Sequence, residues 1–375
     1  KDVLAAQVNV TSPANGSIIT LADAATYTVN GTCSENGRNA VATFSESGGA
    51  HTLQASAVCD TSANPNYTIT ANLSNFADTR ALGISVAVAH QDAAGNAATS
   101  ARHWNVDNAA PMVAISAPPA QNSVTNATSA NFTITTNKAS NICWALDGGA
   151  QTCSGAGMMM FSTGNLTGLT QGNHALVAIA TDAATNQTTV TRNWAVDTTA
   201  PTITISTPPA QNGFSNSTTA NFTLTSSEAA TICWALDGGA QTCSASGAVN
   251  FGTGNLMGLA AGAHALVVTA TDPANNAANL TRNWTIDTTA PTVTISTPPA
   301  EGGTSASAVT FTLTTNEQSD ICWKVDTGAN TCTGPGATTA TASLTGLTLA
   351  AHTLTVTGTD AAGNLTTATR NWTVN

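Results

Sequence analysis

The chain has 375 residues, and only 8% of them are Asp, Glu, Lys or Arg, against about 25% in an average soluble domain. Its 9 basic and 20 acidic residues give a formal net charge of −11, which disfavours binding to nucleic acid or to an anionic lipid surface. No apolar run reaches the length of a transmembrane helix, so we expect no nucleic-acid partner and no membrane span.

Residues 1–107 form the first predicted domain. The segment has short Thr- and Val-rich stretches between Gly, Asn and Pro turns and no helical periodicity, a pattern typical of a β-sandwich. It contains both tyrosines of the chain, Tyr27 and Tyr67, and a widely spaced cysteine pair, Cys33 and Cys59. Because it lacks the cysteine hairpin of the later segments, we expect a divergent domain.

Residues 108–197 form the second predicted domain and contain the sequence ICWALDGGAQTCS from Ile142 to Ser154. A three-residue turn at Asp-Gly-Gly would place Cys143 directly opposite Cys153 in a hairpin. Alternation then puts Ile142, Trp144 and Leu146 on the core face and Cys143 on the other face. The hairpin predicts a disulfide that lies outside the sandwich core.

Residues 198–287 and 288–375 repeat this plan, with the hairpin copied verbatim at 232–244 and in changed form at 321–333. A tryptophan precedes the end of each domain, and the period of about 90 residues is too long for a solenoid repeat. Short linkers that end at Pro111, Pro201 and Pro291 limit the hinges. We expect an all-β chain of four tandem β-sandwich domains arranged as an extended rod.

The eight cysteines occur two per domain, and none has C-x-x-C spacing. Paired structural disulfides in an oxidising, extracellular compartment are the simplest interpretation. The predicted pairs are Cys33 with Cys59, Cys143 with Cys153, Cys233 with Cys243, and Cys322 with Cys332.

The segments ICWALDGGAQTC, GLAAGAHALVVTATDPANN and RNWTIDTTAPTVTIS resemble the bacterial immunoglobulin-like repeats. The later three domains carry this pattern throughout, and the first carries it only from His90 to Pro111. The resemblance implies immunoglobulin-like sandwiches in a secreted or cell-surface protein, where such repeats form stalks, spacers and adhesin shafts. Such modules also occur beside enzymes, so the resemblance defines architecture better than function.

Catalysis is disfavoured by the pattern of titratable residues. His174, His264 and His352 recur at equivalent positions without a neighbouring nucleophile or carboxylate pair. Recurrence in consecutive modules favours a structural role, and we expect no enzymatic activity.

Two sets of aspartates recur near the predicted junctions. One set begins D-x-x-x-N motifs after a strand, and the other begins the linkers. Their carboxylates, with amide and backbone oxygens, could bind Ca²⁺ and stiffen the hinges, or the motifs could be simple Asx turns. No other cofactor is expected. The candidate ligands are Asp92, Asp107, Asp182, Asp197, Asp272, Asp287 and Asp360.

Two further features have competing interpretations. An arginine stands two residues before each recurring tryptophan, which predicts stacking of guanidinium on indole in preference to ligand binding; these are Arg102, Arg192, Arg282 and Arg370. The apolar run Met158 to Met160 is either a contact patch or a loop tucked into its domain.

The favoured function is structural, a subunit or shaft of an extracellular fibre or cell-surface stalk. The alternative is an adhesin whose first domain binds a glycan or protein, for which aromatic side chains clustered in concave loops would be the sign. Both ends of the sequence align with linker positions, so we expect head-to-tail self-association or, alternatively, a trimmed longer chain. The residues expected in that assembly are Lys1, Asp2, Val3, Leu4, Ala5, Ala6, Val374 and Asn375.

Overall fold

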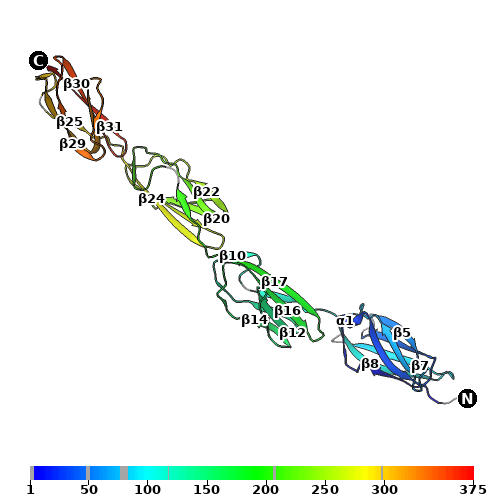
Figure 1. Ribbon diagram of the computed structural model, residues 1–375. Helices are drawn as coiled ribbons and strands as arrows, with labels where there is room; N and C mark the ends of the chain where they lie inside the picture. Colours follow the sequence, from blue (N-terminus) through cyan, green and yellow to red (C-terminus); the bar gives the residue numbers. More distant parts are fainter. Residues whose placement is uncertain (1–3, 48–50, 77–82, 117, 206–207, 297–298) are drawn as a thin grey trace. The chain divides into compact units, whose positions relative to one another are not determined.

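The computed structural model describes the chain except residues 1–3, 48–50, 77–82, 117, 206–207 and 297–298 (Figure 1). The described residues form β-strands and one helical turn, α1 (Leu21–Ala24), whose first turn is capped by Thr20. Two compact units are present, Lys1–Val196 and Asp197–Asn375. Each unit contains two β-sandwiches with separate hydrophobic cores, so the predicted all-β tandem array is confirmed.

The first sandwich packs a three-stranded sheet, in the order β1-β3-β6, against a five-stranded sheet, β2-β8-β7-β4-β5. Inward-facing residues alternate with exposed ones, as in β3, which is buried at every second position. The strands are β1 (Val8–Ser12), β2 (Ile18–Thr20), β3 (Tyr27–Cys33), β4 (Asn39–Glu46), β5 (Thr52–Val58), β6 (Asn66–Ala71), β7 (Ile84–Gln91) and β8 (Ala97–Asp107).

The second sandwich is organised around one long strand, β12. Its first part pairs with β9 and β14, and its second part pairs with β13 and β16. The register shifts between Thr135 and Ser140, where the strand passes from one set of partners to the other. The strands are β9 (Val113–Ser116), β10 (Ser123–Thr125), β11 (Ser129–Ala130), β12 (Thr133–Leu146), β13 (Thr152–Cys153), β14 (Met158–Ser162), β15 (Leu166–Thr167), β16 (Gly172–Asp182) and β17 (Gln187–Val196).

The third and fourth sandwiches follow the same plan, with β20 and β27 as their long strands. The third has β18 (Ile203–Ile205), β19 (Gly213–Ser215), β20 (Thr223–Leu236), β21 (Thr242–Cys243), β22 (Ala248–Gly252), β23 (Gly262–Thr271) and β24 (Ala277–Ile286). The fourth has β25 (Val293–Ser296), β26 (Gly303–Ser305), β27 (Val309–Val325), β28 (Thr331–Cys332), β29 (Ala337–Leu344), β30 (Ala351–Thr359) and β31 (Leu365–Val374).

The recurring tryptophan is the centre of each core. Trp104, Trp194, Trp284 and Trp372 are at most 3% exposed. In the later three sandwiches a buried phenylalanine lies against the indole, with ring centroids 5.1 to 5.2 Å apart. The last strand, which carries this tryptophan, also pairs in parallel with a short strand near the start of its domain. Burial of the tryptophan ring therefore fixes the last strand of each domain to the core of its sandwich.

Candidate functional site at the domain junctions

Each D-x-x-x-N motif forms a closed loop at one end of its sandwich. In the second domain Asp182 Oδ1 accepts hydrogen bonds from the amides of Ala184 and Asn186, at 3.0 and 2.9 Å. The Asn186 side chain donates to Asp182 Oδ2 at 3.2 Å. The equivalent Asp–Asn pairs of the other domains make the same two contacts. The Asx-turn geometry is therefore present in every domain.

The asparagine of each loop also binds the backbone that leads into its domain. Asn186 Nδ2 donates to Asp107 O at 2.9 Å, and Asn276 and Asn364 donate to Asp197 O and Asp287 O at 2.8 Å. Through these bonds the structure brings the two predicted aspartate sets together at three places. In the first domain the equivalent bond goes from Asn96 to Leu4 O at 2.9 Å, so Leu4 takes the linker position there, while Lys1, Asp2 and Val3 lie outside the described residues.

A third titratable residue completes each of these three junctions, and the sequence analysis did not identify it. The residue is Lys138 in the second domain, Glu228 in the third and Glu317 in the fourth, each five positions before the first hairpin cysteine. It lies in the register shift of its long strand, where the backbone departs from the regular ladder. Period-two reasoning does not predict where such a side chain points.

Two of the junctions gather three carboxylates. Asp197, Glu228 and Asp272 form one group, and Asp287, Glu317 and Asp360 form the other; in each, one oxygen per residue lies within 4.8 Å of the others. Burial and the charges of Asp197 and Asp272 raise the pKa of Glu228. Oxygen donors of this type suit a hard divalent cation such as Ca²⁺.

The first junction has a different charge pattern. The ammonium of Lys138 lies 2.6 Å from Asp107 Oδ1 and 3.4 Å from Asp182 Oδ2, and it also donates to Ala109 O. The side chains of the two aspartates are at most 1% exposed, and that of Lys138 is 9% exposed. This is a buried ion-pair network in which one cation is shared by two carboxylates.

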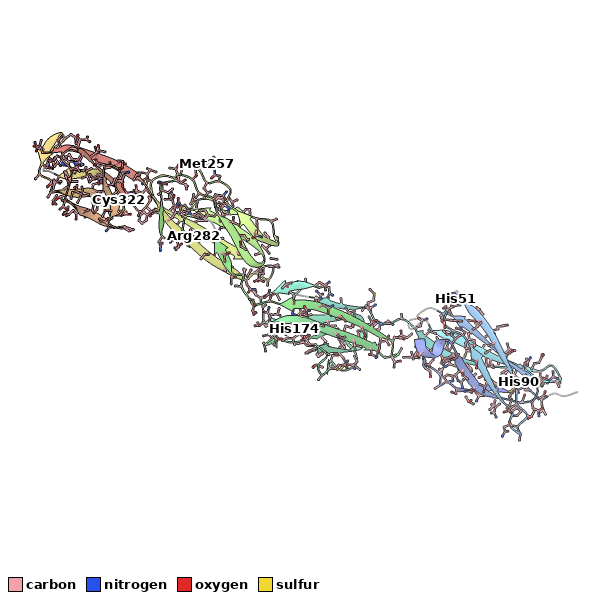
Figure 2. The ribbon with its side chains drawn as sticks, turned by 45° about the horizontal axis from the view of Figure 1, so that its top comes forward. His51, His90, His174, Met257, Arg282 and Cys322 are labelled. Carbon is pink, nitrogen blue, oxygen red and sulfur yellow. A yellow bond between two sulfur atoms is a disulfide. The ribbon has the colours of Figure 1, made fainter. Side chains whose placement is uncertain are left out.

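A second recurring cluster surrounds the histidines at the opposite end of the hairpin strands. Figure 2 marks the position of His174 in the second sandwich. Its Nδ1 lies 2.7 Å from Asp147 Oδ2, and its Nε2 lies 2.8 Å from Thr170 O. Its ring stacks on Trp194 with centroids 5.5 Å apart. The equivalent residues His264 and His352 have the same three partners, an aspartate, a carbonyl and a tryptophan.

Each histidine faces two hydrogen-bond acceptors, an aspartate carboxylate and a backbone carbonyl, so each of its ring nitrogens must donate a hydrogen. An imidazole can donate from both ring nitrogens only in its protonated form. Burial lowers the pKa of His174, but the hydrogen bonds to Asp147 and Thr170 and the Asp147 charge outweigh burial and raise this pKa above its ordinary value. The cluster clamps the hairpin turn, since Asp147 Oδ1 also accepts from Ala175 N at 2.7 Å. Its geometry is that of a structural clamp.

The predicted stacking of arginine on tryptophan is wrong. In the later three domains the histidine ring occupies the stacking position on the tryptophan. Arg282 instead donates to Ile205 O at 2.6 Å and to Pro209 O at 2.9 Å, and Arg102, Arg192 and Arg370 donate to carbonyls in the same way. The arginine thus ties the last strand of each domain to its first strand.

Four intradomain disulfides are present. Cys143–Cys153, Cys233–Cys243 and Cys322–Cys332 each close a hairpin with a sequence separation of 10. Cys143 pairs with Cys153 in register, and Cys153 is exposed, so this disulfide lies outside the core. Ile142 is fully buried, and Trp144 and Leu146 pack against the core while only partly buried.

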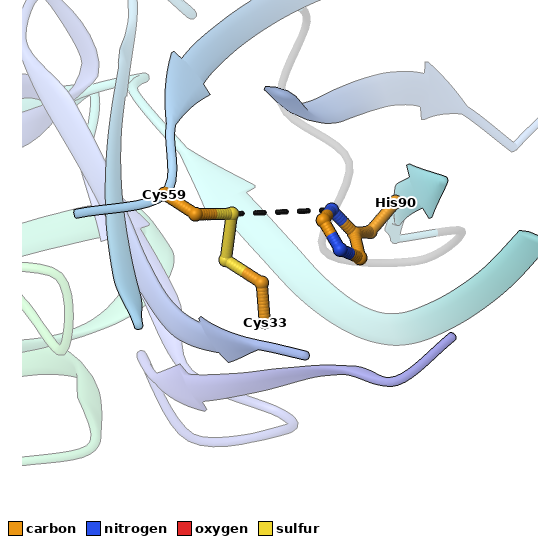
Figure 3. Close-up of side chains that lie close together, drawn as sticks. All are labelled: Cys33, Cys59 and His90. Carbon is orange, nitrogen blue, oxygen red and sulfur yellow. Dashed lines mark hydrogen bonds between the residues drawn. A yellow bond between two sulfur atoms is a disulfide. The ribbon is translucent and has the colours of Figure 1, made fainter. Parts of the chain in front are cut away.

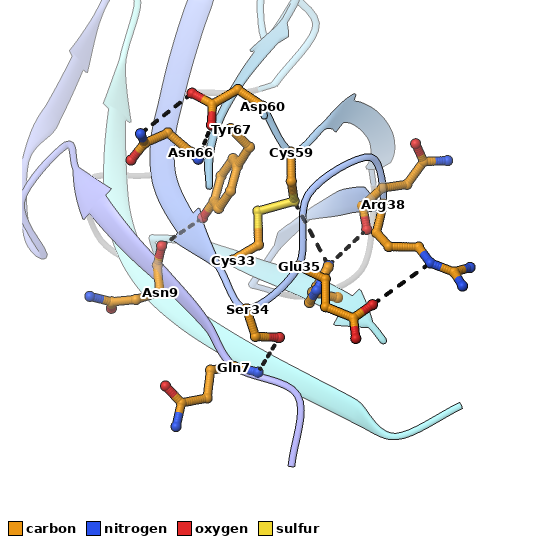
Figure 4. The surroundings of a disulfide bond; sticks show 12 residues. Gln7, Asn9, Cys33, Ser34, Glu35, Arg38, Cys59, Asp60, Asn66 and Tyr67 are labelled. Atoms are coloured by element: carbon orange, nitrogen blue, oxygen red, sulfur yellow. Dashed lines mark hydrogen bonds and ion pairs between the residues drawn. A yellow bond between two sulfur atoms is a disulfide. The ribbon is translucent and has the colours of Figure 1, made fainter. Parts of the chain in front are cut away.

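The first domain carries a different kind of disulfide. Cys33 and Cys59 are 8% and 1% exposed, and they connect β3 of one sheet to the end of β5 of the other. Figure 3 shows His90 beside this bond, with Nδ1 3.9 Å from Cys59 Sγ. Nearby, the Tyr67 hydroxyl donates to Asn9 O at 3.0 Å (Figure 4). The bond is a buried staple between the two sheets.

The structure has opposite consequences for the two candidate contact surfaces, the aromatic side chains of the first domain and the methionine run of the second. The aromatic side chains of the first domain are Tyr27, Phe44, Tyr67, Phe76 and Trp104, and all are at most 7% exposed. The aromatic loop cluster that would indicate an adhesive tip is therefore absent from this domain. The methionines at 158–160 are 43 to 58% exposed on β14, so this run does not tuck into its domain.

Comparison with known proteins agrees with this architecture. Residues 159–238 match the family model of the bacterial Ig-like domain (group 3), a segment that runs from β14 of the second sandwich to the hairpin turn of the third. No curated protein matches the chain. Among the described residues no helix is long and apolar enough to cross a membrane.

Solved structures similar to the chain are tandem arrays of sandwich domains. A tetra-tandem repeat from the extending region of a large adhesion protein is 20% identical, with 99% of each chain covered and a TM-score of 0.33. A 1.5-MDa bacterial ice-binding adhesin is 17% identical, with 76% of this chain and 100% of that chain covered and a TM-score of 0.31. The D1–D4 fragment of ICAM-5 is 12% identical, with 99% of each chain covered and a TM-score of 0.38. At these scores the likenesses carry no functional argument.

Proposed function

We propose that the chain is a spacer segment of an extracellular surface protein, a stalk that holds other parts of that protein at a distance. The observation that carries this proposal is the repeated bond from the asparagine of each D-x-x-x-N loop to the backbone entering its domain. Such bonds restrict rotation of a short linker at its attachment point. A stalk requires stiff junctions, whereas an enzyme requires a constellation of reactive groups.

The molecular surface and the disulfides support the same function. The low content of charged residues and the four disulfides suit a durable protein in an oxidising compartment. The titratable clusters described above are occupied by structural contacts: the histidines bind aspartates and carbonyls, and the arginines bind carbonyls. We therefore propose that this segment is not catalytic.

Single-molecule distance measurements test the spacer function. Dyes attached near residues 63 and 345 report a distance that spans all four domains, and the expected distribution is narrow. Asn276→Ala and Asn364→Ala remove two linker bonds and should broaden it, while the exposed Asn371→Ala, which makes no linker bond, is the control. A broad distribution for the unmodified chain, equal to that of a flexible tether, would contradict the proposal.

A more specific proposal is that copies of the chain associate head to tail into a fibre. Leu4 binds Asn96 in the way that linker residues bind later loops, and Val374 lies at the end of a strand paired with β26. A second copy could supply the linker that precedes Leu4, a heterologous contact that generates filaments. Deletion of residues 1–6 should abolish filaments and leave four folded domains. Filaments that persist after the deletion, or an intact chain that stays monomeric at all concentrations, would refute fibre formation.

A further inference from the structure

The buried disulfide of the first domain has a buried imidazole beside it. His90 lies near the end of β7 and is 2% exposed, and its Nδ1 lies 3.9 Å from Cys59 Sγ (Figure 3). One nitrogen of His90 and the sulfur atoms of Cys33 and Cys59 all lie within 4.8 Å of one another. Two sulfur atoms and one imidazole nitrogen therefore meet at a single buried place in the domain.

One ring nitrogen of this imidazole is left without a hydrogen bond. Nδ1 lies 3.3 Å from Asn39 O, and because a carbonyl only accepts, Nδ1 carries the hydrogen of the neutral ring. Nε2 then keeps the lone pair, and among the described residues this buried atom has no hydrogen-bond partner. Buried polar atoms are nearly always paired, so this lone pair indicates a place for a further ligand. Figure 3 shows both nitrogens of His90 on the edge of the ring that faces the disulfide.

Reduction of the disulfide turns this cluster into a set of metal ligands. A thiol or phosphine reductant supplies two electrons, the S–S bond breaks, and each sulfur takes up one proton. Two cysteine thiols and a histidine lone pair then lie together, a donor set that zinc prefers. Neighbouring sulfur and nitrogen ligands of tetrahedral zinc lie about 3.5–3.8 Å apart. The three ligand atoms of this cluster, all within 4.8 Å of one another, need only small side-chain movements to reach that spacing.

The surroundings of the cluster leave room for an ion. The Cα atoms of Cys33 and Cys59 are 6.4 Å apart, toward the wide end of the range for disulfides, so the sulfurs can separate while the strands stay in place. A surface hollow of about 530 Å³ is lined by Arg38, Asn39, His90 and Gln91, among other residues. This hollow supplies an entry path and a water molecule for the fourth ligand position.

The hairpin disulfides have a different environment. The second cysteine of each pair, Cys153, Cys243 or Cys332, is exposed. Among the described residues only the fourth domain adds another candidate ligand to its hairpin pair, the carboxylate of Asp320 beside Cys322 and Cys332. An exposed thiol and a carboxylate hold zinc less well than enclosed thiols with an imidazole. The fourth-domain trio is therefore the natural control for the first-domain cluster.

We propose that the reduced first domain binds one Zn²⁺ ion through the thiolates of Cys33 and Cys59 and Nε2 of His90, with water as the fourth ligand. Binding expels the two thiol protons, because only thiolates coordinate the metal. The hydrogen bond from Nδ1 to Asn39 O holds the ring in the tautomer that the site requires. Zinc then joins β3 to the end of β5, as the disulfide does. A disulfide reagent that accepts the two electrons re-forms the S–S bond and releases the ion.

Cobalt titration of the reduced full chain tests the site, because Co²⁺ adopts the geometry of zinc and absorbs visible light. The chain is reduced with a phosphine in the absence of air and titrated with CoCl₂, then with ZnCl₂. One Co²⁺ per chain should bind, with the visible bands of a tetrahedral ion and a sulfur-to-cobalt charge-transfer band in the near ultraviolet. Zn²⁺ should displace the cobalt and raise the melting temperature of the reduced first domain. The oxidised chain should show none of these bands.

Two variants separate this site from ordinary thiol binding. His90→Ala should weaken zinc binding about 100-fold or more, because it removes a ligand itself and not a neighbour of a ligand. Its fold is verified in the oxidised state, where the disulfide is retained. Cys322→Ser with Cys332→Ser removes the fourth-domain trio and should leave the stoichiometry and the spectrum unchanged.

Four results would each overturn the proposal. They are a reduced chain without the charge-transfer band, equal binding by His90→Ala, loss of binding in the fourth-domain variant, and the same binding by the oxidised chain.

Discussion

The histidine clamps make the stability of the later three domains depend on pH. Each clamp satisfies both acceptors only when the imidazole is protonated, and the pKa values of His174, His264 and His352 are raised above the ordinary value. A group whose pKa is higher in the folded state stabilises the fold fully below its unfolded pKa. This contribution is lost as the pH rises through the folded pKa, so melting temperature should fall from pH 5.5 to pH 8.5.

The size of this effect follows from the bonds that are lost. Deprotonation leaves one of two acceptors without its donor, and a hydrogen bond to a charged group contributes about 1.5–3 kcal/mol. Because the side chain of Asp237 is 42% exposed, water compensates part of this loss, and we expect about 1 kcal/mol per domain. For a domain of this size that corresponds to about 4–8 °C in melting temperature.

Calorimetry of the full chain between pH 5.5 and 8.5 measures the shift. The first domain shows which residue can replace the histidine. Its Ile84 pairs with Trp104 in the same way that His264 pairs with Trp284 in the third domain. The variant with isoleucine at 174, 264 and 352 should lose the pH dependence of the later domains. A melting temperature that is constant or rises over this range, or a pH dependence that survives the triple substitution, would refute the clamp.

Three other outcomes are expected. Non-reducing peptide mapping should find the four intradomain disulfides only, and any pair between domains would be contrary to the structure. Reduction of Cys233–Cys243 should cost about 3 kcal/mol and lower the melting temperature without unfolding the third domain, because the core residue Ile232 remains buried; complete unfolding at room temperature would disprove this. Arg282→Ala leaves two carbonyls without a donor and should destabilise the third domain by about 2–3 kcal/mol. Urea denaturation measures this loss, and the control is Arg38→Ala, because the side chain of Arg38 is 47% exposed.

The fold was predictable from the sequence because its signals are local. Strand alternation and the hairpin turn involve neighbouring residues, and a tryptophan recurs near the end of each of the four domains. The exact domain boundaries remain a prediction. The first domain was recognised as divergent and its Cys33–Cys59 pairing was predicted. The burial of this bond between the two sheets was not predicted, because nothing local distinguishes it from a disulfide that closes a surface loop.

The site was only partly predictable because its contacts are long-range. The aspartates were identified by their motifs, whereas Lys138, Glu228 and Glu317 lie in a register shift and belong to no motif. Comparing the three repeats column by column would have shown this charge exchange. The arginine was placed on the correct face, but the indole ring was already covered by a histidine 20 residues earlier in the chain.

The position of the disulfides determines how far the chain can lengthen under tension. When a domain is pulled, the force passes along the backbone as far as the first cysteine of a disulfide. The disulfide then carries the force across to the second cysteine, so the loop between the two cysteines bears no load. Each hairpin disulfide, with a sequence separation of 10, withholds about 35 Å of extended chain. The Cys33–Cys59 bond, with a separation of 26, withholds about 90 Å. In an unfolded domain these segments stay slack, so mechanical extension stops short of the full contour length and refolding begins from a shorter chain.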